Sequence, residues 1–427
     1  MNIATHSFAN GLRLVVVPMP HLHSVEMVCY VGAGGRDETP ETAGVSHMVE
    51  HMLFRGNDAY PDSLTLERAF EAVGGGANAS TDVETTCFFS RIHPERVEEG
   101  GRLFSHLLRG PRWRDLELER RIILEEARED LNERGEIIDP DTLTNGLLWP
   151  GSVLGQPLIG TPETINALSE GELARYHQAL YTPDNMVLVL AGRVEPQQAE
   201  DAVAGAFSDW RGRCRPKAFE LPALPEGPVS TWVRDSDSQA SLQLALRLPW
   251  GRHHQHAPAL RLWRRILSWG GGSRLMLRLR EELGLTYHVE ANLHLLDDTG
   301  SLTIDLAVQP DNLVPAFAEI LALLRQMLDE TVGDDELARI LQGYRYDLDY
   351  SRDLPEEMAV RYGWGELVGF RRDIGEDWAR AQTVTPRLLQ EVAGEVLKPA
   401  CMALAVVGPW TRAQQRQVEK MLAGFRI

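Results

Sequence analysis

The sequence predicts an α+β fold of two structurally related domains from an internal duplication, each a mainly antiparallel sheet covered by helices. Segments 181–194 and 397–410, YTPDNMVLVLAGRV and LKPACMALAVVGPW, align at a constant offset of 216 residues. Each follows a helix-like segment and precedes one rich in Gln, Glu and Ala. Strand-like and helix-like runs also alternate without the strict βαβ order of a parallel nucleotide-binding fold.

The elements of the first half follow from local patterns. A hairpin is expected around the turn Asn10-Gly11, because this dipeptide favours tight turns between strands. Strands are expected where β-branched or aromatic residues lie between turn residues, at 12–17, 24–32, 85–92 and 186–192. Helices are expected where apolar residues recur every three to four positions, at 64–74, 96–110 and 115–135.

The boundary between the halves is expected at 214–228, CRPKAFELPALPEGP, which contains four prolines and has no apolar periodicity. The sequence therefore predicts a first domain over 1–213, a linker over 214–228 and a related second domain over 229–427.

Bulk composition narrows the classes of partner and location. The formal net charge of -19 argues against nucleic-acid partners, whose phosphates would be repelled, and favours neutral or basic ones. No apolar run reaches transmembrane length and no signal-peptide pattern is present, so we expect no membrane partner and a cytoplasmic location. The cysteines form no CxxC pair, which favours neither a disulfide framework nor a cysteine zinc site: Cys29, Cys87, Cys214 and Cys401.

The apolar helical run at 43–56, AGVSHMVEHMLFRG, contains two histidines and a glutamate. Burying such groups is costly unless they have partners. His47 and His51 lie four residues apart, so they share a helix face and can bind one Zn²⁺. Glu50 is placed to hold a water at the metal, as in the H-x-x-E-H motif. Two core histidines without a metal are the alternative interpretation.

A catalytic zinc site needs a third protein ligand and an open position. The predicted helix 115–135 offers five glutamates, Glu117, Glu119, Glu125, Glu126 and Glu129. Glu119 and Glu126 are two turns apart and share a face with the apolar residues between them. A ligand is expected from this pair.

These residues resemble the inverzincin metallopeptidases of the pitrilysin/insulysin family, and in size its processing-peptidase branch. In that family a zinc-binding glutamate lies about 75 residues after H-x-x-E-H, and Glu126 follows His51 by 75 residues. A second glutamate seven residues earlier, here Glu119, supports the site from behind the ligands. The resemblance implies a zinc metalloendopeptidase with one Zn²⁺ per chain, held by His47, His51 and Glu126, with Glu50 as the base.

Two further segments resemble the family. Segment 74–89 is similar to its glycine turn and edge strand, where an extended peptide substrate pairs with the sheet, which implies contacts from Asn78, Ala79 and Ser80. Segment 270–289 contains the R-x6-Y pattern, Arg280 and Tyr287, whose side chains would hold a substrate carbonyl and stabilise the oxyanion. Taken alone, these segments read as an ordinary edge strand, a surface arginine and a core tyrosine.

The resemblance also bears on assembly. Long single-chain members resemble four such domains closing around a chamber, so two copies of this chain would supply the same number. A homodimer is our first expectation, with Arg280 and Tyr287 serving the opposite copy. A heterodimer with a metal-free paralogue is the alternative, and the alternative function is a catalytically silent or partner-dependent subunit of a heterodimeric processing peptidase.

One loop of the second half is unusually rich in histidine. GRHHQHAP, at 251–258, contains His253, His254 and His256. A solvated loop is the favoured interpretation because no carboxylate or cysteine is close in sequence, and a second metal site is the alternative.

Overall fold

The computed structural model describes residues 3–215 and 219–426, and its chain divides into two compact units. The first unit comprises 1–127, 156–220 and 349–373, and the second comprises 128–155, 221–348 and 374–427. These units differ from the predicted division at 214–228 in two segments. Residues 128–155 belong to the second unit, and residues 349–373 belong to the first. Residues 216–218 of the predicted linker lie outside the described residues.

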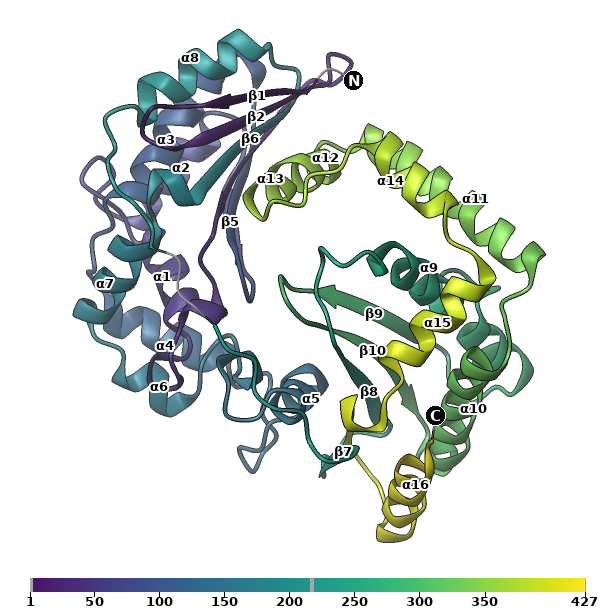
Figure 1. The fold of residues 1–427 in the computed structure, drawn as a ribbon. Coiled ribbons are helices and arrows are strands. Elements are labelled where there is room, and N and C mark those ends of the chain that lie inside the picture. Colours follow the sequence, from purple (N-terminus) through teal and green to yellow (C-terminus); the bar gives the residue numbers. More distant parts are fainter. Residues whose placement is uncertain (1–2, 216–218, 427) are drawn as a thin grey trace. The chain divides into compact units, whose positions relative to one another are not determined.

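The first unit is built on a six-stranded sheet in the order β1-β2-β6-β3-β5-β4 (Figure 1). Only β2 and β6 pair in parallel; the other neighbours are antiparallel. The expected hairpin is formed by β1 and β2. The strands are β1 Ala4–Ser7, β2 Arg13–Pro18, β3 Val25–Val31, β4 Ala77–Thr81, β5 Thr86–Ile92 and β6 Met186–Gly192.

Helices cover both faces of this sheet. The odd-numbered residues of β3, such as Met27 and Cys29, join a core with Met48 and Met52 of α1. The opposite face of β3 is covered by α12. Burial on both faces explains why β3 and β6 are apolar almost throughout. The helices are α1 Val45–Leu53, α2 Ser63–Glu71, α3 Val97–Arg109, α4 Leu116–Glu126, α6 Pro162–Ala167, α7 Glu170–Leu180, α8 Pro196–Phe207, α12 Pro355–Ala359 and α13 Gly365–Leu367.

The expected helix over 115–135 is wrong in its second half, since α4 ends at Glu126. Leu131 and Ile137 instead form an antiparallel bridge around Gly135, whose φ is 74°. The side chain of Asn132 accepts hydrogen bonds from the backbone N–H groups of Arg134 and Glu136, at 2.9 and 3.0 Å. This local turn chemistry outweighs the helix-favouring glutamates and arginines.

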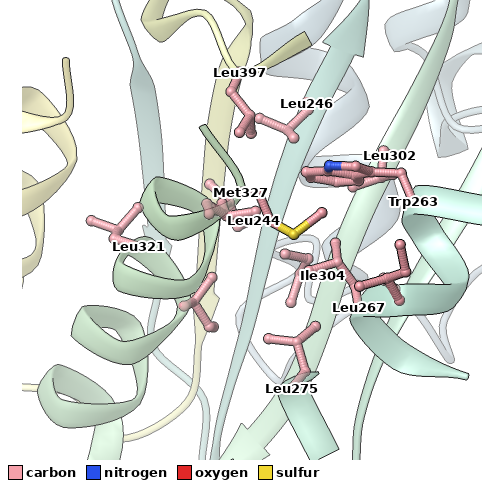
Figure 2. Close-up of a cluster of buried hydrophobic side chains, with 14 of the residues drawn as sticks. Leu244, Leu246, Trp263, Leu267, Leu275, Leu302, Ile304, Leu321, Met327 and Leu397 are labelled. Carbon is pink, nitrogen blue, oxygen red and sulfur yellow. The ribbon is translucent and has the colours of Figure 1, made fainter. Parts of the chain in front are cut away.

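The second unit repeats the plan with a five-stranded sheet in the order β7-β11-β8-β10-β9, in which only β7 and β11 are parallel. Figure 2 shows its core, where leucines of β8 and Ile304 of β10 pack against Trp263 of α9 and Met327 of α10. The strands are β7 Val229–Val233, β8 Ala240–Leu248, β9 Val289–Leu295, β10 Gly300–Val308 and β11 Met402–Val407. The helices are α5 Pro140–Leu148, α9 Ala257–Ser268, α10 Leu313–Asp329, α11 Asp334–Tyr350, α14 Ile374–Gln382, α15 Pro386–Val396 and α16 Arg412–Gly424.

The repeated segments occupy equivalent places in the two sheets, which confirms the predicted fold class. β6 lies between a parallel and an antiparallel neighbour, and so does β11. A glycine with positive φ stands at the end of each strand. Gly192, with a φ of 140°, is the last residue of β6, and Gly408, with a φ of 119°, follows β11. A Cβ on Gly192 would lie 2.2 Å from the Ser24 carbonyl, so the close approach of backbone requires glycine.

α5 shows why one segment crosses the expected boundary. It contacts β7, β8 and β11 of the second sheet. Thr144 is buried, and its hydroxyl donates a hydrogen bond to the side-chain oxygen of Gln243. The side-chain nitrogen of Gln243 in turn donates to Asp141 at 2.8 Å. Across the described residues, no helix is both long and apolar enough to span a bilayer.

Candidate metal centre

The helix that carries the H-x-x-E-H motif is anchored at its start by a residue outside it. Glu38 is buried and its carboxylate accepts from the backbone N–H groups of Gly44 and Ser46, each at 2.9 Å. Burial raises the pKa of Glu38 to about 7, although the bonds from Ser46 and Gly44 oppose it. A side chain thus satisfies the free N–H groups at the start of α1.

His47 and His51 face the same carboxylate. The Nε2 atom of His47 lies 3.7 Å from Glu126 Oε1, and that of His51 lies 3.7 Å from Glu126 Oε2. One ligand atom from each of the three residues lies within 4.8 Å of the others. The Glu126 side chain is 47% exposed, so this constellation opens to solvent and leaves room for a further ligand.

Glu119 holds His51 from the side away from Glu126. Nδ1 of His51 lies 2.9 Å from Glu119 Oε1, and Arg55 donates to the other carboxylate oxygen. Burial opposes ionisation of Glu119, but the His51 hydrogen bond and the Arg55 charge outweigh it and lower its pKa. A proton on Nδ1 leaves the lone pair of His51 on Nε2, facing Glu126.

The two histidines have different protonation environments. Burial, reinforced by the neighbouring His51, lowers the pKa of His47 to about 4. Burial also acts on His51, but Glu119 and then Glu126 outweigh it and raise its pKa. Among the described residues, the buried Nδ1 atom of His47 has no hydrogen-bond partner. Two imidazole nitrogens and a carboxylate oxygen converging in this way fit the donor set of a zinc site.

Glu50 lies beside these groups without joining the three that converge. Its side chain is buried, and the Thr81 hydroxyl donates to Oε2. Burial raises the pKa of Glu50, although the Thr81 bond and the His51 charge oppose this. A carboxylate with a raised pKa and a fixed orientation is suited to accept and return a proton.

Thr81 and Arg55 are functional candidates that sequence reasoning missed. Thr81 is the last residue of β4, and Arg55 lies just beyond the end of α1. Neither residue is marked by a local sequence pattern, because its partner belongs to another element: Glu119 for Arg55 and Glu50 for Thr81. For Arg55, the spacing of four residues from His51 is the only sequence feature that suggests a place near the motif.

β4 is the edge strand expected over 74–89. It pairs on one side with β5, in the register Asn78↔Phe89, Ala79↔Phe88 and Ser80↔Cys87, and ends the strand order of the first sheet. The side chains of Asn78 and Ser80 are exposed, and Ala79 is half-buried. A strand in this position presents unpaired backbone groups to a further strand.

A cavity of about 550 Å³ adjoins β4 within the first unit. Its walls combine Asn78 of β4 with Phe89 of β5 and Tyr30 of β3, together with the buried carboxyl of Glu26. Burial, and then the charge of Glu356, raises the pKa of Glu26, while Arg91 opposes the shift. This largely apolar hollow beside an edge strand has the character of a side-chain pocket for an extended peptide.

Arg280 and Tyr287 lie together in the second unit. Arg280 belongs to a π-helix at Met276–Glu282, and its guanidinium carbon lies 4.9 Å from the centre of the Tyr287 ring. Tyr287 is 82% exposed, which rules out the alternative of a core tyrosine. Their role toward a substrate stays a prediction.

A two-unit α+β chain with an H-x-x-E-H helix facing a second-helix glutamate has the architecture of a zinc-protease-like peptidase. Residues 14–161 match the family model described as Insulinase (Peptidase family M16), and residues 167–344 match Peptidase M16 inactive domain. The chain belongs to peptidase family M16, as the relatives below also show.

An uncharacterised zinc protease of Mycobacterium leprae is 30% identical over 416 residues, which cover 94% of this chain and 90% of that protein. A protease from Helicobacter pylori has a similar fold, with a TM-score of 0.88 at 19% identity over 96% of this chain and 99% of the other. The periplasmic protease PqqL from Escherichia coli aligns with all of this chain over 50% of its own, with a TM-score of 0.77 at 18% identity.

Proposed function

We propose that this chain is a zinc metalloendopeptidase that cleaves extended peptides. The observation that carries the proposal is the convergence of His47, His51 and Glu126 with the separate, buried carboxylate of Glu50 beside them. Relatives named zinc proteases support zinc as the metal. The proposal assigns one ion per chain to these three residues.

When bound, Zn²⁺ supplies a Lewis acid that polarises the scissile carbonyl and lowers the pKa of a water molecule. Glu50 accepts the proton of the attacking water and later delivers it to the leaving amine. The Thr81 hydroxyl fixes the orientation of Glu50, and Glu119 fixes the ring of His51.

The substrate class follows from the edge strand. A peptide in extended conformation can add to β4 through backbone hydrogen bonds, with Asn78, Ala79 and Ser80 beside it. Its alternate side chains would then point toward the cavity at Phe89 and Tyr30. This geometry supports unfolded peptides as substrates rather than folded proteins.

We propose a homodimer that encloses a chamber. The alignment of this chain with half of the longer PqqL chain supports the idea that two copies supply the full set of domains. In this arrangement Arg280 and Tyr287 of one copy bind the substrate carbonyl at the zinc site of the other. A heterodimer with a metal-free paralogue is the alternative, with this chain as its partner-dependent subunit. The proposal includes a cytoplasmic location, without nucleic-acid or membrane partners.

The test separates the proposed base from the proposed ligand. In Glu50→Gln, we expect zinc content near that of the wild type and loss of peptide cleavage by on the order of 10²-fold or more, because only a base is removed. In Glu126→Gln, we expect the ion at His47 and His51 to be lost, so that the zinc content falls by one ion per chain. Elemental analysis and a fluorogenic peptide library measure the two effects.

Loss of zinc from Glu50→Gln, or full zinc in Glu126→Gln, would contradict these roles. A wild-type chain that binds zinc but cleaves no peptide until a paralogue is added would favour the partner-dependent subunit.

A further inference from the structure

The histidine-rich loop of the second unit meets a carboxylate that is distant in sequence. His254, His256 and Glu395 each offer one ligand atom, and these atoms lie within 4.8 Å of one another. The loop precedes α9, and Glu395 lies in the last turn of α15, which packs against α9. The cluster belongs to the unit that lacks the H-x-x-E-H motif.

The contacts within this cluster match the spacing of metal ligands. Nδ1 of His256 lies 3.0 Å from Glu395 Oε1 and 3.1 Å from Oε2. Two ligand atoms on a tetrahedral ion, with bonds of about 2.0–2.1 Å, are separated by roughly 3.3 Å. The existing pair therefore needs little movement to bind a common ion.

The His254 ring makes few interactions that a bound metal would have to replace. Its Nδ1 atom receives a long contact of 3.3 Å from the backbone N–H of His256. Its ring stacks on Trp250, with centroids 4.4 Å apart and an angle of 16°.

Trp250 also supports the carboxylate. Its indole N–H donates to Glu395 Oε2 at 3.1 Å, so one side chain orients both a histidine and the glutamate. The side chains of His256 and Glu395 are 19% and 36% exposed, which leaves solvent a path to the cluster. Outer residues that orient metal ligands are a usual part of a metal site.

We propose that His254, His256 and Glu395 form a second divalent-cation site, separate from the site on α1, and that Zn²⁺ is the ion it prefers. Two imidazole nitrogens and one carboxylate oxygen suit Zn²⁺, and suit Co²⁺ as a spectroscopic substitute. The ion ties the start of α9 to the end of α15, across 139 residues of chain. Its role is structural, because a clip that closes a long loop stabilises the folded unit.

The experiment uses the full chain carrying His47→Ala and His51→Ala, so that the site on α1 cannot contribute. Titration with Co²⁺ is followed by visible absorption, and thermal unfolding is recorded with and without Zn²⁺. We expect one Co²⁺ per chain with the bands of a tetrahedral or five-coordinate site, and a rise in Tm of several degrees with Zn²⁺. The wild-type chain in excess Zn²⁺ then holds two ions rather than one.

Adding His254→Ala/His256→Ala, or separately Glu395→Gln, should weaken Co²⁺ binding at least tenfold and remove the shift in Tm. Glu395→Gln keeps an acceptor for the Trp250 indole, so it tests the ligand without removing that hydrogen bond. His253→Ala and Glu391→Gln are the matched controls, since His253 contacts Asp297 and Glu391 pairs with Arg387 instead. Both controls should leave binding unchanged.

Absence of Co²⁺ binding in the chain without the α1 site would overturn the proposal, as would binding that survives Glu395→Gln. In either case the cluster is an ordinary ion pair with a stacked histidine. The assignment of the site on α1 is unaffected by that outcome, because the measurement is made in its absence.

Discussion

At the scale of single residues, the geometry of the candidate metal centre depends on a carboxylate outside the three converging residues. Glu119 is only 5% exposed and is shared between His51 and Arg55. A buried charge is stable there because both partners are charge-assisted donors. Glu119 therefore orients the His51 ring and favours a proton on its Nδ1 atom.

We expect Glu119→Gln to reduce zinc affinity by about 10- to 100-fold while leaving the three ligands in place, because an amide orients the imidazole less firmly than a carboxylate. Competition with a chromophoric chelator measures the affinity. Glu117→Gln is the control on the same helix, since Glu117 is exposed and pairs with Arg120. Equal zinc affinity in the wild type and Glu119→Gln would remove Glu119 from the site.

His177 makes the stability of the first unit sensitive to acid. Its ring is buried, stacks on Tyr181 and lies 2.8 Å from the Leu108 carbonyl through Nε2. Burial lowers the pKa of His177 to about 4, and the Leu108 bond opposes this only in part. Between about pH 6.5 and 4 the unfolded chain gains a proton that the folded chain does not, so stability falls as pH falls.

We expect His177→Gln to lose less stability than the wild type between pH 7 and pH 5, by about 2 kcal/mol, at about 1.4 kcal/mol per pH unit below 6.5. Urea unfolding of the first unit, followed at both pH values with a chelator present, measures the difference. The exposed His106, changed to Gln, is the control. The same acid sensitivity in His177→Gln and the wild type would contradict the assignment.

At the scale of elements, β4 is the feature that would link the candidate metal centre to a peptide under the proposed function. Thr81 at its end donates to Glu50, and its outer edge is free of a partner strand in the first sheet. A peptide added to this edge in extended form would bond through alternate backbone amides.

We expect N-methylation of a substrate peptide to raise KM in a period-two pattern along the peptide. Each methyl group at a paired amide removes a hydrogen bond worth about 0.5–1.5 kcal/mol, or roughly 2- to 10-fold in binding. Steady-state kinetics on a set of singly methylated peptides gives the pattern, with the unmethylated parent as reference. A uniform or absent effect would argue against strand addition at β4.

The elements themselves were predictable to different degrees. The strands at 12–17, 24–32, 85–92 and 186–192 are predictable from β-branched and aromatic residues between turn residues, and the first helices from apolar residues every three to four positions. The helix 115–135 was overextended because its charged residues favour helix formation, whereas the Asn132 turn is a local side-chain effect.

At the scale of the whole molecule, the proposed dimer makes one prediction that does not depend on the cleaved sequence. Glu50 and the Arg280/Tyr287 pair belong to different units of the chain. If the pair serves the opposite copy, two inactive chains can repair each other.

Mixing Glu50→Gln with Arg280→Ala/Tyr287→Phe should restore roughly a quarter of wild-type activity after subunit exchange, because half of the dimers are mixed and each has one complete site. Each variant alone and a mixture kept from exchanging are the controls. No recovery despite exchange shown by differently tagged chains would exclude a site shared in trans.

The sequence by itself determined the fold class, the duplication and the helix with the H-x-x-E-H motif, because these depend on spacings within one element or on a repeated segment. Four residues along a helix always return to the same face, so His47 and His51 were paired without any tertiary information. The glutamate partner required the family resemblance in addition.

Tertiary packing alone decided the contacts between elements far apart in the chain. No sequence pattern predicts three of these contacts: Glu38 at the start of α1, Thr81 beside Glu50, and Glu395 beside His256. No local period records which two surfaces will meet, since that depends on how whole helices and strands bury their apolar faces together. For this reason the loop GRHHQHAP read as solvated in the sequence, and only the packing of α15 against α9 supplied its carboxylate.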